Sequence, residues 1–70
     1  MITPDQKHEI SLKLVAAMDR LEKGDLSLAE TVRLIDAIER EFPGDERQTR
    51  FYEAARKLAV MVAELVAEFR

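Results

Sequence analysis

Apolar side chains recur every three or four positions in three stretches of this chain, which is the period of an α-helix with one buried face. The third stretch keeps an unbroken heptad spacing, so we expect Leu58→Ala or Leu65→Ala to cost about 2–5 kcal/mol of stability if these side chains are buried in the core. In chain order, the three predicted core stripes are Ile10, Leu14, Ala17 and Leu21; Leu28, Val32, Ile35, Ile38 and Phe42; and Phe51, Ala55, Leu58, Val62, Leu65 and Phe69.

A helix-start signal precedes each stretch, and the pairs that form these signals are Thr3 with Gln6, Ser27 with Glu30, and Asp45 with Gln48. Gly24 and Gly44 fall where a left-handed residue would end a helix. These signals predict helices at about 4–23, 28–42 and 46–69.

No stretch alternates apolar and polar residues for long enough to predict a strand. The two connections have about four residues each, and connections this short favour antiparallel neighbours. The predicted fold is therefore all-α, a three-helix up-down-up bundle with short loops that forms a single domain over residues 1–70.

The composition fits one small soluble domain: 70 residues, 47% of them apolar, with no cysteine to form disulfides or thiolate sites. The start of the chain carries Lys7, His8 and Glu9 instead of the apolar stretch of a signal peptide. We therefore expect a cytoplasmic protein that does not enter the membrane.

Side chains that could support catalysis are few. His8 has Ser11 and Leu12 at the next helical positions, which is not a metal-binding set, and Glu64 with Glu68 forms the polar face of the third helix. Phosphate-binding loops and nucleophile motifs are absent from the sequence. We predict a non-enzymatic protein with no catalytic residues, no cofactor, no metal site and no small-molecule substrate.

A basic cluster at the start of the third helix is the alternative functional signal, because basic side chains on a helix after a short turn are typical of helix-turn-helix readers of DNA. The net charge of −3 opposes binding to nucleic acid, and Arg50 has Glu46 and Glu53 at pairing distance along the helix. The candidate nucleic-acid residues are Arg47, Gln48, Arg50, Arg56 and Lys57.

The stretch Arg20–Glu30 resembles the helix-turn-helix hairpin of the small subunit of bacterial exonuclease VII, a short helical non-catalytic protein that binds its large subunit. The likeness implies two helices joined by a short turn. It ends after Ile38, because this chain breaks at Pro43 and Gly44 and begins a third apolar helix where that family continues its second. No function is carried over from this stretch.

Some apolar residues lie off the three stripes, and one bundle does not easily bury them: Leu12, Val15, Val60 and Met61. We interpret them as an interface, which predicts a protein–protein interaction module whose partner is a second copy, as in a two-fold homodimer, or another protein. The regular caps and short loops also fit an engineered helical scaffold with no biological function. This origin is a further alternative.

Overall fold

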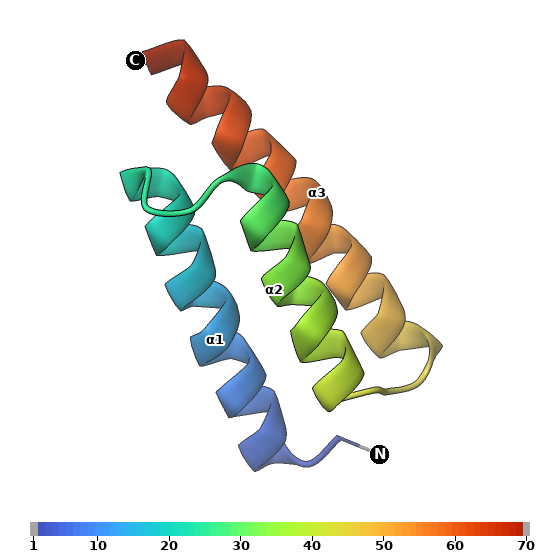
Figure 1. Ribbon diagram of the computed structural model, residues 1–70. Helices are drawn as coiled ribbons and strands as arrows, with labels where there is room; N and C mark the ends of the chain where they lie inside the picture. Colours follow the sequence, from blue (N-terminus) through green and yellow to red (C-terminus); the bar gives the residue numbers. More distant parts are fainter. Residues whose placement is uncertain (1, 70) are drawn as a thin grey trace.

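The computed structural model describes residues 2–69 of the chain, which fold into three packed helices joined by short loops (Figure 1). Helix α1 spans Pro4–Lys23, α2 spans Leu28–Glu41 and α3 spans Glu46–Phe69. The chain runs up, down and up, so α1 and α3 are parallel and α2 is antiparallel to both. This confirms the predicted all-α architecture, with α2 ending one residue before the predicted boundary.

The helix starts form as the sequence predicts. The Thr3 hydroxyl accepts from the Gln6 amide while the Gln6 side chain accepts from the Thr3 amide, and Ser27 and Glu30 repeat this reciprocal capping box. These bonds satisfy amides that have no partner inside the helix.

The two glycines serve different purposes. Gly24 is left-handed with φ of 83° and closes α1, as predicted. Gly44 does not have a positive φ, so the prediction of a second left-handed residue is wrong. A Cβ added at Gly44 would lie 2.5 Å from the Gln48 Cβ, and the position therefore needs glycine for close approach to α3.

Gly24→Ala should lower the free energy of unfolding by about 1 kcal/mol, because alanine is strained in the left-handed conformation. Urea denaturation followed by circular dichroism measures the change. Asp25→Ala, in the same exposed turn, is the control. Equal stability of Gly24→Ala and the unsubstituted protein would contradict the assigned cap.

The core of α1 and α2 follows the predicted stripes closely. Leu28 and Val32 are half-buried at the edge of the core. Thr31 is fully buried, although the sequence pattern does not predict a core position for it. The Thr31 hydroxyl donates to the Ser27 carbonyl at 2.9 Å, which satisfies the polar atom inside the core. The buried predicted residues are Ile10, Leu14, Ala17, Leu21, Ile35, Ile38 and Phe42.

Helix α3 is rotated relative to the prediction. Its buried residues are Tyr52, Ala55 and Ala59, of which the predicted stripe contains only Ala55. Alanine on this face lets α3 approach the larger side chains of α1 and α2 closely, which is the physical reason for the rotation. Val62 is half-buried. The prediction is wrong for Phe51, Leu58, Leu65 and Phe69, which are exposed.

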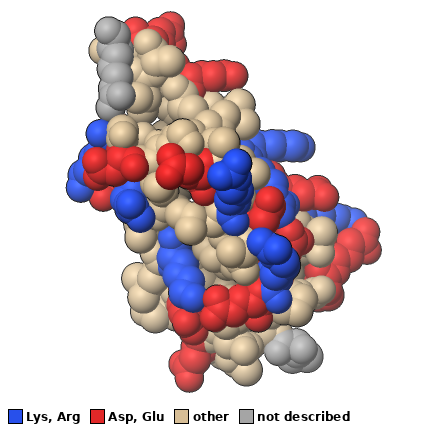
Figure 2. Space-filling view, in the orientation of Figure 1, with Lys and Arg blue, Asp and Glu red and all other residues tan. Residues whose placement is uncertain are grey.

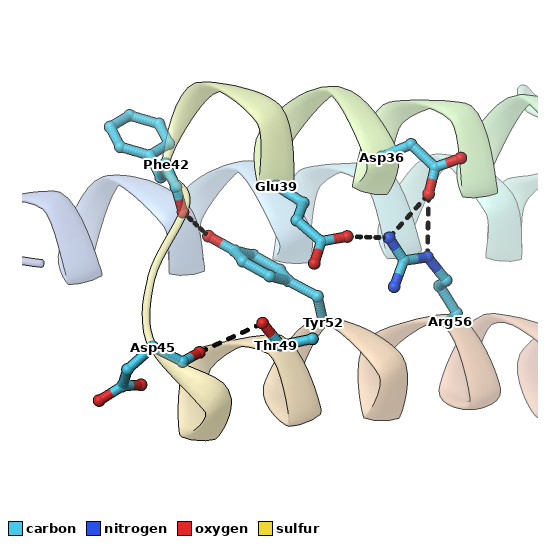
Figure 3. Close-up of polar contacts among 7 residues, drawn as sticks. All are labelled: Asp36, Glu39, Phe42, Asp45, Thr49, Tyr52 and Arg56. Carbon is cyan, nitrogen blue, oxygen red and sulfur yellow. Dashed lines mark hydrogen bonds and ion pairs between the residues drawn. The ribbon is translucent and has the colours of Figure 1, made fainter.

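Polar contacts fix the pairing of α2 and α3 (Figure 3). The Tyr52 hydroxyl donates to the Phe42 carbonyl at 2.7 Å, at the loop between the two helices. Further along α3, Arg56 donates to Asp36 at 2.9 Å and also pairs with Glu39. The hydrogen bond that Arg56 donates to the Glu39 carboxylate, with a further contribution from Asp36, raises the pKa of Arg56. These contacts hold the rotational setting of α3 against α2.

Helix α3 is also the longest of the three, with 24 residues against 14 in α2. In Figure 1 its last turns project past the loop that joins α1 to α2. No helix within residues 2–69 is long and apolar enough to cross a membrane.

Candidate interaction surface

The rotation of α3 leaves an apolar stripe on its outer side. Phe51, Ala54, Leu58, Met61 and Leu65 follow one another at alternating intervals of three and four residues, which places them along one side of the helix. All five are exposed, with Leu58 at 49%, Met61 at 58% and Leu65 at 52%. The large members of a heptad stripe therefore face away from the bundle core.

An open groove of about 550 Å³ lies between this stripe and α1. The floor includes Leu14 and Ala55, which also belong to the buried core, and Val15 lies on the α1 side. A second recess shares Glu22 and Val62 with the groove and continues it toward the end of α3. We call the following residues the α1/α3 apolar face: Val15, Met18, Phe51, Ala54, Leu58, Met61, Val62, Leu65 and Phe69.

The four predicted interface residues are all exposed, but they do not form one patch. Val15 lines the groove, and Met61 belongs to the outer stripe of α3. At about 100° per residue, Leu12 lies further round α1 from the groove, and Val60 lies toward the side on which Arg56 contacts α2. Of these four residues only Val15 lines the groove; Met61 lies on the adjoining stripe of α3, and Leu12 and Val60 lie outside both.

The sequence pattern predicts core positions for the largest side chains of this face, which the structure shows to be exposed. Phe51, Leu58 and Leu65 form a regular heptad, and this regularity is equally compatible with packing inside the bundle or against another chain. The sequence does contain one signal for the face that α3 buries, a second stripe made of Tyr52, Ala55 and Ala59. Small residues such as these alanines are suited to close contacts between helices.

The five basic-cluster residues also divide between different surroundings. Arg50 pairs with Glu46 at 2.7 Å, and Arg56 lies across α3, paired with α2. Gln48 is half-buried, and its backbone amide donates to the Asp45 carboxylate that caps α3. Arg47 and Lys57 are exposed. The cluster therefore does not present all five side chains on one surface.

Charges of both signs alternate over the face shown in Figure 2, and neither sign covers a broad area there. His8 is exposed near the start of α1. Between residues 2 and 69, no group of three or more His, Cys, Asp or Glu side chains is arranged to hold a metal ion.

Comparison with known proteins gives no relative for this chain: no family model, no curated protein sequence and no solved structure matches it.

Proposed function

We propose that this protein is a non-enzymatic self-association module in which two copies bind through the α1/α3 apolar face. The observation that carries the proposal is the exposed heptad stripe of α3 beside an apolar groove. A helix bearing such a stripe fits into a groove between two helices, so each copy supplies both the knob and the hole.

The size of the face supports association with another copy. Its large side chains expose on the order of 600 Å² of apolar surface per protomer, close to the roughly 800 Å² per partner of a standard stable interface. A monomeric chain this short also gains more than a large one from burying an additional surface. Pairing two such faces would place α1 and α3 of both copies around a shared four-helix core.

Leu58→Asp should convert the associated protein into a folded monomer, because a carboxylate would be buried at the centre of the stripe in both copies. We expect the dimer Kd to rise on the order of 100-fold or more, measured by sedimentation equilibrium across a concentration series. Circular dichroism should show the same helical content as the unsubstituted protein, since Leu58 lies outside the core.

Leu34→Asp is the matched control, because Leu34 is 39% exposed on α2 and lies outside the α1/α3 apolar face. This variant should keep the oligomeric state of the unsubstituted protein. An unsubstituted protein that sediments as a monomer at high micromolar concentration would overturn the proposal.

A further inference from the structure

The α1/α3 apolar face is flanked by charges that change sign along its length. Basic side chains flank its first half, where Lys7 lies beside Phe51, and acidic side chains flank its second half, where Glu22 lies beside Leu65. The basic residues are Lys7, Arg47, Arg50 and Lys57, and the acidic residues are Asp19, Glu22, Glu64 and Glu68. Each half also holds one opposite charge in an ion pair, Glu46 with Arg50 in the first half and Lys23 with Asp19 in the second. Because α1 and α3 are parallel, Asp19 and Glu22 of α1 lie at the same end of the face as Glu64 and Glu68 of α3.

We propose that two copies of this chain bind antiparallel, with the α3 helices crossing near Leu58 and Met61. This inference rests on the self-association proposed above and specifies its geometry. In this orientation the basic half of each face meets the acidic half of the other, so the charges are complementary in both halves. A parallel pair would bring Lys57 against Lys57 and Glu64 against Glu64, which is repulsive.

The heptad positions are consistent with specific pairs across the antiparallel contact. When Leu58 of one copy lies beside Met61 of the other, Arg50 comes level with Glu68 of the second copy to within about one residue, or roughly 1.5 Å along the axis. Lys57 comes within about two residues of Glu64 in the same way. All four side chains lie on the same flank of α3, and antiparallel helices pair like flanks with each other.

The contact between Arg50 and Glu46 within α3 does not prevent this pairing. Both side chains of that ion pair are largely exposed, at 71% and 81%. A guanidinium group has five N–H donors and can bind a second carboxylate while keeping the first. Arg50 is therefore available to Glu68 of a second copy.

The absence of cysteine from the sequence makes the orientation directly testable by disulfide crosslinking. Arg50→Cys and Glu68→Cys each place one thiol on the exposed flank of α3. In the antiparallel pair, a mixture of the two variants should give a disulfide between different variants, whereas neither variant alone should crosslink. Two Arg50 positions would be about 28 Å apart along the axis, well beyond the roughly 7 Å limit for Cα atoms joined by a disulfide.

Charge reversal gives an independent readout. Arg50→Glu with Lys57→Glu should raise the dimer Kd on the order of tenfold by turning attractive pairs into repulsive ones. Adding Glu64→Lys and Glu68→Lys to the same chain should restore the original Kd, because the pairs are then reversed but complementary. In a parallel pair, each charged residue would face the same residue of the other copy, so like charges would meet in the unsubstituted protein and in both variants. The Kd of a parallel dimer would therefore neither rise with the first two substitutions nor recover with the second two.

The two proposals fail in different ways. A protein that sediments as a dimer while Arg50→Cys crosslinks to itself overturns the antiparallel geometry and leaves self-association standing. A dimer that gives no disulfide in the mixture also overturns this geometry. A monomeric unsubstituted protein overturns self-association itself.

Discussion

Replacing Tyr52 by alanine is expected to lower the free energy of unfolding by about 3–5 kcal/mol, enough to unfold a large fraction of so small a domain. Tyr52 is fully buried and is the largest core side chain on α3, so its removal leaves a cavity where α3 packs on the rest of the bundle. Urea denaturation followed by circular dichroism, at one fixed protein concentration, measures the loss.

Tyr52→Phe separates the ring from the hydroxyl. It retains the packing but leaves the Phe42 carbonyl without its hydrogen bond, which should cost about 1–3 kcal/mol. Phe51→Ala, one residue away and 45% exposed, should cost less than Tyr52→Ala. If Phe51→Ala destabilised the monomer more than Tyr52→Ala, the rotational setting of α3 would be wrong.

Ile35→Ala should cost about 2–5 kcal/mol, because Ile35 is 0% exposed at the centre of the α2 stripe. The same denaturation measurement applies. Leu34→Ala on the adjacent position is the control, and we expect it to change the free energy of unfolding by less than about 1 kcal/mol. Similar losses for the two substitutions would contradict the assignment of the buried face of α2.

The buried faces of α1 and α2 could be predicted from the sequence because one stripe on each helix is clearly the most apolar. Ile10 and Ile35 each belong to such a stripe, and both are buried. Local signals were equally informative at Thr3 and Ser27, whose capping boxes depend only on residues three positions away.

The face that α3 buries could not be predicted in the same way, because two stripes compete on that helix. Leu58 and Leu65 have larger side chains than Ala55 and Ala59, so hydrophobicity alone favours the stripe that is exposed. The choice depends on how much volume the facing residues of α1 and α2 already fill, and this is a tertiary property. The same limit applies to Arg56, whose partners Asp36 and Glu39 are on another helix.

The apolar side chains near the exposed end of α3 lie outside the core, so the fold and the proposed contact can vary independently. Leu65 and Phe69 are exposed at 52% and 84%, and neither is part of the core shared by the three helices. If the proposed dimer forms, substitutions at these positions would strengthen or weaken the contact while leaving the bundle intact. The lifetime of the proposed dimer could therefore be adjusted by selection or by design without a compensating change in the interior.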